Sequence, residues 1–201
     1  VYATPEGTRA SKGRAIQNVI QIEPDDAVRA YINVRRLDDR EYVTSNYIIM
    51  CTKAGIVKKT LLEAYSRPRQ NGVNAITIKE GDQLIEAKLT SGDSEVLLAA
   101  KEGKAIRFNE KAVRPIGRTG AGVKGITIDG DDEVVGMICV EKDRKEDILV
   151  VSEHGYGKRT DLDDYRITNR GGKGVKTLQI TEKTGKLIAI KAVTDENDLM
   201  I

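Results

Sequence analysis

Large aromatic side chains are scarce in this sequence of 201 residues, which contains one Phe and no Trp. A core built mainly from aromatic rings is therefore excluded, and Ile, Val and Leu must fill the interior, a composition that favours β-strands. The sequence has a single histidine, His154, with no Ser, Cys or metal-ligand cluster at a suitable spacing. No catalytic triad or metal centre is indicated, and we expect His154 to face solvent on a turn.

Cysteines and long apolar runs are scarce as well. Cys51 and Cys139 lie 88 positions apart, a spacing that fits neither a disulfide framework nor a zinc site. We expect both thiols to be reduced, in a cytoplasmic protein. No apolar run approaches the roughly 18 residues that a membrane span requires, so no membrane partner is expected. The sequence shows no signal peptide, and its first residue, Val1, predicts a chain that begins inside a longer product.

What the sequence does contain is an internal repeat, marked by two series of glycines. The turn glycines follow one another at intervals of 48 and 52 residues: Gly55, Gly103 and Gly155. The loop glycines, each at the end of a basic loop, follow at intervals of 50 and 52 residues: Gly72, Gly122 and Gly174. A period near 50 residues with four short strands per unit is typical of propeller-like radial arrays, so we predict an all-β chain.

Each unit is predicted to hold four strands in a fixed order. The first is apolar and runs into the turn glycine: 47–55, 95–103 and 147–155. The second is short and basic: 55–60, 103–108 and 155–160. The third follows the basic loop, begins Gly-Val and continues with alternating apolar residues: 72–78, 122–128 and 174–180. The fourth is apolar: 82–90, 132–140 and 185–193, with 25–34 as an earlier copy.

The apolar runs at 96–100 and 148–151 are nearly continuous, so we expect them to be central strands buried on both faces. Helix is poorly supported, and only 61–65 and 110–113 could each hold a turn. The repeat predicts a single, partial β domain over residues 1–201. Its units are predicted at 1–46 (partial), 47–94, 95–146, 147–196 and 197–201 (the start of a further unit).

Charge follows the repeat, although the net charge is only +2. In the windows 55–79, 103–128 and 155–180, which run from each turn glycine to the end of the third strand or one residue beyond it, the sequence carries five or six basic residues against one to three acidic ones. Acidic residues concentrate in other connections, such as 129–133 and 141–147. Because equivalent segments of a radial array come to the same edge, we expect a basic rim.

The residue four positions after each turn glycine is basic in every unit: Lys59, Arg107 and Arg159. With the period of two along a strand, these side chains are expected to point the same way in their units. A curved row of Lys and Arg is suited to a polyphosphate backbone, which it would contact without reading base sequence. A convex rim would bend duplex DNA, and glycine-rich loops add backbone N–H donors for phosphate.

Several of these segments carry a family resemblance. The basic strands, which read Gly-Ile-Val-Lys-Lys-Thr, Gly-Lys-Ala-Ile-Arg-Phe and Gly-Tyr-Gly-Lys-Arg-Thr, resemble those of the C-terminal domain of DNA gyrase A subunits, in the type IIA topoisomerase family. The Gly-Val-Lys strands, the stretch 5–14 and the turn 89–93 fit the same family. The resemblance covers essentially the whole chain and implies a β-pinwheel, a six-bladed propeller-like array with strands exchanged between blades.

The resemblance also implies a function. DNA would wrap around the basic outer edge, which supports negative supercoiling by an ATP-dependent type II topoisomerase. The partners would be double-stranded DNA, the remainder of the gyrase A subunit, and the gyrase B subunit in an A2B2 assembly. No catalytic residue and no cofactor are expected in this chain, because ATP and Mg²⁺ would be used by other domains.

One loop is close to the family's gyrase box, Gln-Arg-Arg-Gly-Gly-Lys-Gly. Residues 169–174 read Asn-Arg-Gly-Gly-Lys-Gly, but their neighbours resemble a later blade, and the first blade would precede Val1. We therefore carry over phosphate contact for Arg170 and Lys173 without identifying this loop as the box itself. The candidate DNA-binding residues are basic and lie in the rim segments: Arg9, Lys12, Arg14, Lys58, Lys59, Arg67, Arg69, Lys104, Arg107, Arg114, Arg118, Lys124, Lys158, Arg159, Arg170, Lys173 and Lys176.

Other functions have weaker support in the sequence. The matching domain of topoisomerase IV, which selects DNA segments without full wrapping, is the nearest alternative. A protein-interaction propeller would need an exposed apolar or aromatic patch, and the few aromatic residues do not recur in phase with the repeat. An enzyme with its site in a central channel lacks a convergent acid–base set, and the P-loop spacing is absent around residues 171–174.

Overall fold

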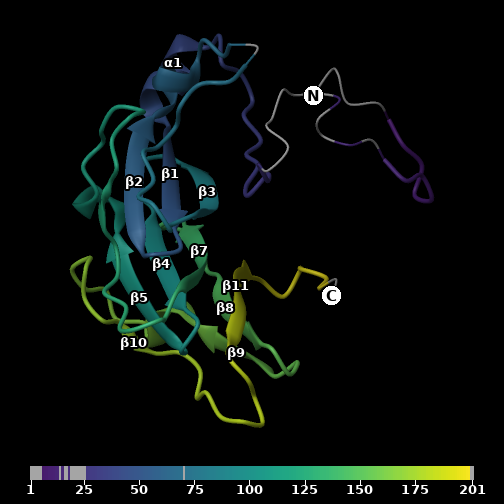
Figure 1. Cartoon of the computed structure of the whole chain (residues 1–201), viewed down its shortest axis with the longest axis vertical. Helices are drawn as coiled ribbons and strands as arrows, with labels where there is room; N and C mark the ends of the chain where they lie inside the picture. Colours follow the sequence, from purple (N-terminus) through teal and green to yellow (C-terminus); the bar gives the residue numbers. More distant parts are fainter. Residues whose placement is uncertain (1–5, 14, 16–17, 19–25, 70, 200–201) are drawn as a thin grey trace.

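The chain forms antiparallel β-sheets that follow one another along a curved row, as Figure 1 shows. The computed structural model describes residues 6–13, 15, 18, 26–69 and 71–199. The first sheet has, in spatial order, β3 (Leu84–Thr90), β1 (Tyr47–Thr52), β2 (Ile56–Leu61) and β6 (Val123–Lys124). The second has β10 (Val175–Lys176), β5 (Lys104–Asn109), β4 (Glu95–Ala100) and β7 (Val134–Val140). The third has β11 (Leu187–Val193), β8 (Asp147–Ser152) and β9 (Gly157–Asp161).

Successive sheets exchange strands. β6 follows the second sheet's hairpin in sequence but pairs with β2 of the first sheet, with Lys124 opposite Ile56. β10 in the same way pairs with β5 of the second sheet, with Lys176 opposite Lys104. The strand exchange that the family resemblance implies is confirmed. The predicted boundaries of the repeat units stay a prediction. Because β6 and β10 pair with a strand of the preceding sheet, a sheet and a predicted unit do not contain the same strands.

The turn glycines explain how neighbouring sheets attach to each other. Gly55 and Gly103 have φ values of 78° and 79°, a conformation that side chains disfavour. The carbonyl of Gly55 accepts hydrogen bonds from the amides of Gly125 and Ile126, at 2.8 and 3.3 Å. The carbonyl of Gly103 accepts the two equivalent bonds from the chain that follows β10. A Cβ on Gly55 would lie 2.7 Å from Ile126, so both the turn and the close approach require glycine.

Apolar clusters fill the spaces between the sheets. One cluster joins the first and second sheets and contains Ile49, Leu98 and the single phenylalanine, Phe108. A second cluster joins the second and third sheets, through residues such as Leu97 and Ile148. A third lies under α1 (Arg40–Ser45), a helix whose N-cap Asp39 accepts a hydrogen bond from the amide of Tyr42.

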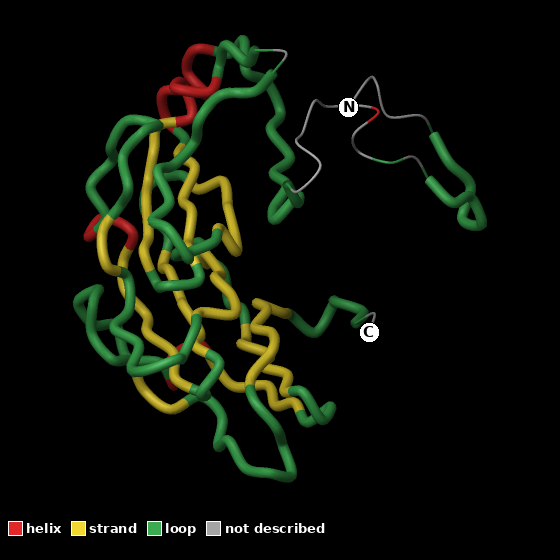
Figure 2. Tube along the Cα trace, in the orientation of Figure 1, coloured by secondary structure: helices red, strands yellow, loops and turns green. Residues whose placement is uncertain are grey.

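Most predicted elements are confirmed. The first, second and fourth strands of each unit match β1, β2 and β3, then β4, β5 and β7, then β8, β9 and β11. The two predicted helical turns are the 3₁₀ helices η2 (Leu62–Tyr65) and η3 (Glu110–Ala112), whereas α1 and η4 (Leu162–Asp164) were not predicted. Figure 2 shows how small these helical parts are beside the strands. No helix in the described part of the chain is long and apolar enough to cross a membrane.

Three predictions about strands are wrong. The third strands are much shorter than predicted: β6 and β10 have two residues each, and no strand forms at 71–78. The reason is that their later backbone groups bond to loops, as when Thr127 donates its amide to Gly172 at 2.8 Å. Residues 26–34 are not a strand, although Ile32 packs on the cluster under α1; residue 25 lies outside the described residues. β8 is buried on one face only, since Leu149 and Val151 are half-buried, whereas 96–100 is buried on both faces as predicted.

Candidate nucleic-acid interface

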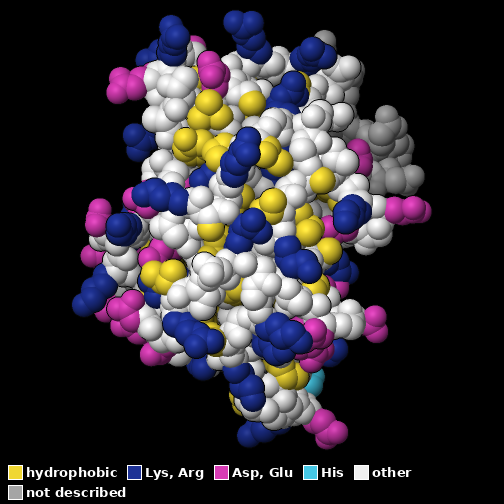
Figure 3. Space-filling model, turned by 90° about the vertical axis from the view of Figure 1, so that its left-hand side faces the viewer, with side chains coloured by type: hydrophobic (Ala, Val, Ile, Leu, Met, Phe, Trp, Pro, Cys, Tyr) yellow, Lys and Arg dark blue, Asp and Glu magenta, His cyan; other side chains and the backbone are white. Residues whose placement is uncertain are grey.

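Three basic loops lie beside the outer strands of the sheets. We call them rim loop 1 (66–69 and 71–78), rim loop 2 (113–122) and rim loop 3 (166–174). Rim loops 2 and 3 lie along the left-hand margin of Figure 1, the side that faces the viewer in Figure 3. Figure 3 shows Lys and Arg side chains following one another along the middle of this face, while most acidic side chains lie toward its margins.

Hydrogen bonds connect the rim loops to one another. The Thr77 hydroxyl in rim loop 1 donates to the carbonyl of Thr119 in rim loop 2, at 2.6 Å. The equivalent Thr127 hydroxyl, which follows rim loop 2, donates to the carbonyl of Gly171 in rim loop 3, at 2.7 Å. The Gly171 amide returns a bond of 2.6 Å to the carbonyl of Gly125. The rim loops therefore form one connected series along the sheets.

Two of the predicted DNA-binding arginines take part in this connection. Arg118 in rim loop 2 donates to the carbonyl of Asn74 at 3.3 Å. Arg170 in rim loop 3 donates to the carbonyl of Lys124 at 3.0 Å and to that of Ala112 at 2.9 Å. Arg118 and Arg170 are both half-buried. Because their guanidinium groups also bond to backbone carbonyls, they are only partly accessible to a ligand.

Exposed cations repeat at equivalent positions of consecutive rim loops. Arg114 precedes the loop glycine Gly122 by eight residues, and Arg166 precedes Gly174 by the same number. Lys124 and Lys176 each end the two-residue strand that follows. All four residues are exposed, and among the described residues Arg114, Lys124 and Arg166 have no ion pair or side-chain hydrogen bond. Arg166 was not among the predicted DNA contacts, although its spacing from the loop glycine already matched that of Arg114.

The remaining predicted contacts divide by exposure. Arg67, Arg69, Lys158 and Lys173 are exposed and Lys104 is half-buried. Lys173 pairs with Asp129 at 3.0 Å, and Lys173 together with Lys104 holds the pKa of that carboxyl below its usual range. Because both partners are largely exposed, this pair is weak and does not remove Lys173 from the surface. Arg9 and Lys12 are exposed, and Arg14 lies outside the described residues.

Three predicted contacts are buried, which corrects the sequence-based prediction. Lys58, Lys59 and Arg107 have relative exposures of 0, 3 and 7%. The Lys58 ammonium donates to the carbonyls of Ala75 and Arg118. The Lys59 ammonium donates to the carbonyl of Glu110 at 3.0 Å and lies 5.0 Å from the ring centre of Tyr47. Burial lowers the pKa of both lysines, that of Lys58 to about 8. None of the three cationic groups is available to a phosphate on the surface.

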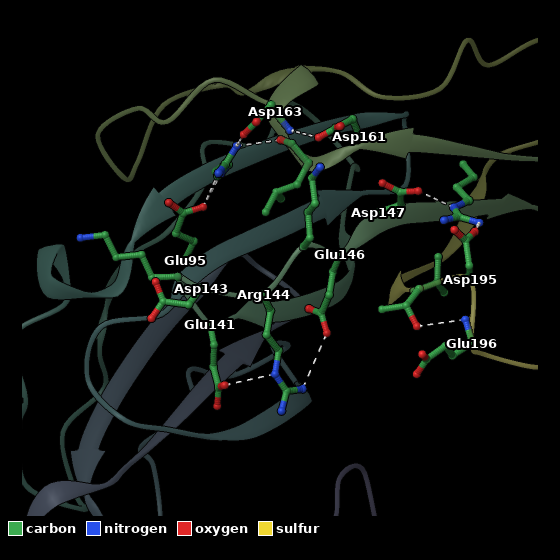
Figure 4. A pocket seen from close by; sticks show the side chains of 17 residues that line it. Glu95, Glu141, Asp143, Arg144, Glu146, Asp147, Asp161, Asp163, Asp195 and Glu196 are labelled. Atoms are coloured by element: carbon green, nitrogen blue, oxygen red, sulfur yellow. Dashed lines mark hydrogen bonds and ion pairs between the residues drawn. The ribbon is translucent and has the colours of Figure 1, made fainter.

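Arg107 and Arg159 face an acidic hollow rather than the rim loops. The hollow lies between the second and third sheets and is lined largely by carboxylates of the 141–147 connection and the strand ends, as Figure 4 shows. Arg107 donates to Glu95 at 2.6 Å, and Arg159 bonds to Asp147 at 2.5 Å and to Asp195 at 2.7 Å. These last two carboxylates raise the pKa of Arg159. The register confirms that Lys59, Arg107 and Arg159 are equivalent, since they lie opposite Ile49, Leu97 and Leu149.

The burial of Lys59 and Arg107 has a common cause. A segment of the following unit lies along the basic strand, with short parallel bridges that join Lys59 to Pro115 and Arg107 to Ile167. The alternation of side chains along a strand predicts that Lys59, Arg107 and Arg159 point the same way. It does not predict whether a segment of the next unit covers that face of the strand. Among the described residues, no group of three or more His, Cys, Asp or Glu side chains is arranged to hold a metal ion.

The fold and the surface together define a class: an all-β array of strand-exchanging sheets with a connected series of basic loops along one side. Comparison with known proteins gives the family. The family model described as DNA gyrase C-terminal domain, beta-propeller, matches residues 46–91, 94–141 and 146–194. The chain belongs to this family.

Individual relatives agree with this assignment. The chain is 44% identical over 200 residues to the DNA gyrase A subunit of Staphylococcus aureus (strain NCTC 8325 / PS 47), and equally to that of Staphylococcus epidermidis. These matches cover 100% of the chain and 22% of each relative, so the chain spans about a fifth of their length.

Two solved structures show the same fold. The crystal structure of the C-terminal domain of DNA topoisomerase IV matches with a TM-score of 0.81 at 28% identity, over 91% of this chain and 55% of that one. The structure of a DNA gyrase A C-terminal domain matches with a TM-score of 0.77 at 24% identity, over 92% of this chain and 60% of that one. The predicted family and β-pinwheel fold are confirmed.

Proposed function

We propose that this chain binds and bends double-stranded DNA along its rim loops, without base-sequence preference. The observation that carries the proposal is the repetition of exposed cations at equivalent positions: Arg114 with Arg166 in consecutive rim loops, and Lys124 with Lys176 on the short strands that follow them. Exposed cations that repeat along a curved surface suit a phosphate backbone, because each contact releases counterions and none needs a particular base. Arg67 and Arg69 in rim loop 1 and Lys173 in rim loop 3 are further exposed cations of the same loops, and Lys158 is exposed on β9.

We place this activity within DNA gyrase, as the part of its A subunit that wraps DNA and supports ATP-dependent negative supercoiling. The 44% identity to gyrase A subunits over the whole chain favours this assignment. The partners would then be the rest of the gyrase A subunit, and the gyrase B subunit in an A2B2 assembly. ATP and Mg²⁺ would act in other domains, and a DNA substrate together with two free cysteines favours the cytoplasm.

The test is a pair of double variants with the same change in charge. Lys124→Ala with Lys176→Ala removes two rim cations, and Lys142→Ala with Lys145→Ala removes two exposed cations from the acidic connection beside the hollow. Band shifts over a salt series should show the rim variant losing about 1.8 from the magnitude of the slope of log K against log salt, at about 0.9 per contact. The control variant should keep the wild-type slope. Equal slopes for the two variants would contradict the proposed surface.

A topoisomerase IV-like role is the second candidate, favoured by the TM-score of 0.81 to that C-terminal domain. The two roles differ in wrapping. Closed circular DNA that is relaxed in the presence of the chain should change its linking number if the DNA is wrapped. Binding with an unchanged linking number would favour segment selection without full wrapping.

A further inference from the structure

Lys58 has an unusual environment for a lysine. It lies on β2 and is one of the largest fully buried side chains of the protein. Its ammonium donates to the carbonyl of Ala75 in rim loop 1 and to the carbonyl of Arg118 in rim loop 2. An ammonium is costly to bury unless it is hydrogen-bonded, so these two carbonyls are the groups that permit its position. One buried charge therefore joins two loops from consecutive units.

The other contacts between these two loops are nearer the surface. Thr77 donates its amide to Gly120 at 3.3 Å, and its exposed side chain donates to Thr119 at 2.6 Å. Arg118 reaches the carbonyl of Asn74 at 3.3 Å. Exposed hydrogen bonds compete with water and contribute little each, whereas a bond to a buried charge is about twice as strong as a neutral one. Lys58 is thus the strongest identifiable connection between rim loops 1 and 2.

The equivalent position in the second sheet holds Ile106, three residues after the turn glycine Gly103, as Lys58 follows Gly55. Ile106 is buried against rim loop 3, where a Cβ on Gly172 would lie 3.4 Å from its Cδ1. There the loop connection consists of the Gly171 and Thr127 backbone bonds, the Thr127 hydroxyl and Arg170. The fold accepts an aliphatic residue at this position, so the sheet itself does not require the charge of Lys58.

We infer that Lys58 is a positioning residue for DNA binding: it fixes the separation of rim loops 1 and 2, so that the cations of both loops meet one phosphate backbone together. The inference rests on the proposed function. Rim loop 1 carries Arg67 and Arg69, and rim loop 2 carries Arg114 and Arg118. Cations held at a fixed separation lose less conformational freedom on binding than cations on independent loops.

The surroundings of Lys58 give the inference a pH signature. Burial, followed by the nearby Arg118 guanidinium, lowers the pKa of Lys58 to about 8. The Tyr65 hydroxyl also faces this site, 3.4 Å from the Ala75 carbonyl, and burial raises its pKa. Between pH 7 and 9 the Lys58 ammonium therefore loses its proton while Tyr65 keeps its own. A neutral amine binds carbonyls less strongly, so the loop connection should weaken over this interval.

The test compares Lys58→Met with Lys124→Met, which removes an exposed rim cation. Amide hydrogen exchange without DNA should be faster at Thr77 in Lys58→Met, while Thr127, the equivalent residue at the next loop pair, stays as in the wild type. Lys58→Met should weaken DNA binding about tenfold or more and reduce the salt slope by more than the roughly 0.9 of a single contact. It should also lose the decline in affinity between pH 7 and 9.

The control predicts a different pattern. Lys124→Met should reduce the slope by about 0.9, keep wild-type exchange at Thr77 and keep the pH dependence. If the wild type fails to bind DNA but Thr77 exchange still responds to Lys58→Met, the proposed function fails and the loop connection stands. Unchanged Thr77 exchange and an unchanged salt slope in Lys58→Met would overturn the inference.

A third measurement covers the case in which Lys58→Met does not fold. The protection factors of Thr77 and Thr127 in the wild type are compared between pH 7 and 9, each corrected for its intrinsic exchange rate. A loss of protection at Thr77 alone supports the inference, and equal behaviour of the two amides overturns it.

Discussion

The two junctions between consecutive sheets use the same contact with different chemistry. At junction 1, between the first and second sheets, Lys59 donates one bond to the carbonyl of Glu110, at 3.0 Å. At junction 2, between the second and third sheets, Arg107 donates to the equivalent carbonyl of Leu162 at 2.7 Å and also to that of Tyr165 at 2.9 Å. Because the guanidinium presents several donors in a rigid fork, it makes more bonds than an ammonium at the same position.

The comparison teaches that a repeated cation is not by itself a ligand contact. Lys59 and Arg107 recur in phase because each connects its own sheet to the first helical turn of the next unit, η3 or η4. The residues at the start of these turns also differ. Leu162 packs in the apolar cluster at junction 2, whereas Glu110 at junction 1 is fully buried with both carboxyl oxygens unpaired among the described residues. Junction 1 therefore has fewer bonds and an added desolvation cost.

Removal of Arg107 should have the largest effect on stability. Arg107→Met leaves Glu95 and two carbonyls without their buried partner, which should lower the free energy of unfolding by about 3–5 kcal/mol. Lys59→Met should cost less, about 2–3 kcal/mol, because it removes one charge-assisted bond and the contact with Tyr47. Urea unfolding measures both.

Arg159→Met is the matched control, because Arg159 occupies the equivalent position and also pairs with two carboxylates, but its side chain is 42% exposed. It should lower the free energy of unfolding much less than Arg107→Met does, because ion pairs of an exposed side chain contribute little to stability. If the loss in Arg107→Met were no larger than in Arg159→Met, the guanidinium would not hold junction 2 together.

Replacement of Glu110 by leucine, the residue at the equivalent position of junction 2, should increase the free energy of unfolding instead of lowering it. Glu110→Leu removes a buried carboxyl whose oxygens accept no hydrogen bond from the described residues and whose only nearby cation is Lys59 among the groups that shift its pKa, and it should raise the free energy of unfolding by about 1–3 kcal/mol. Burial raises the pKa of Glu110 above its ordinary value of 4.5, so the folded protein binds this proton more tightly than the unfolded chain does. The contribution of Glu110 to stability therefore falls as pH rises above about 4.5, and the advantage of Glu110→Leu should grow from pH 4.5 to pH 7.5.

Glu110→Gln separates the desolvation of a polar group from the titration of the carboxyl, because it removes the titration but keeps a polar group at the same buried site. It should lose the pH dependence and gain less stability than Glu110→Leu. A Glu110→Leu variant that is less stable than the wild type at pH 7.5 would show that the carboxylate has a favourable partner, and junction 1 would not be the costlier of the two.

The sequence predicts the strands well because their signals are local. Alternation of apolar residues and glycines with positive φ at hairpin turns depend on neighbouring residues, as at Gly55 and Gly103. The sequence does not predict which cations are buried, because that depends on the segment that folds over them. Lys59 and Arg107 are covered by the segments that follow η3 and η4, whereas Arg114 and Lys124 stay exposed. Net charge within a window cannot distinguish these cases.

The short third strands were mispredicted for a related reason. The residues after β6 and β10 alternate as a strand does, but their first amides bond to a turn glycine, and after β6 also to a rim loop, instead of to a neighbouring strand. Periodicity reports which side chains face inward and not which backbone groups pair. The phase of the repeat nonetheless predicted the series of basic loops along one side. Arg166 lies at the same distance from its loop glycine as Arg114, so a comparison of every unit at this position would have identified a further exposed cation.

The smallest expected effect concerns the two threonine hydroxyls that connect neighbouring rim loops, one at each junction. At junction 2 the rim loop is held by backbone bonds, Arg170 and the half-buried Thr127 hydroxyl, next to the aliphatic Ile106. At junction 1 the equivalent Thr77 is exposed, and the buried Lys58 ammonium bonds to both of the loops that Thr77 connects, rim loops 1 and 2. Thr127→Val should therefore cost about 1 kcal/mol and Thr77→Val less than about 0.5 kcal/mol in urea unfolding. Equal losses in the two variants would mean that Lys58 adds nothing to the attachment of rim loops 1 and 2, since the surface hydroxyl would then be as necessary at junction 1 as at junction 2.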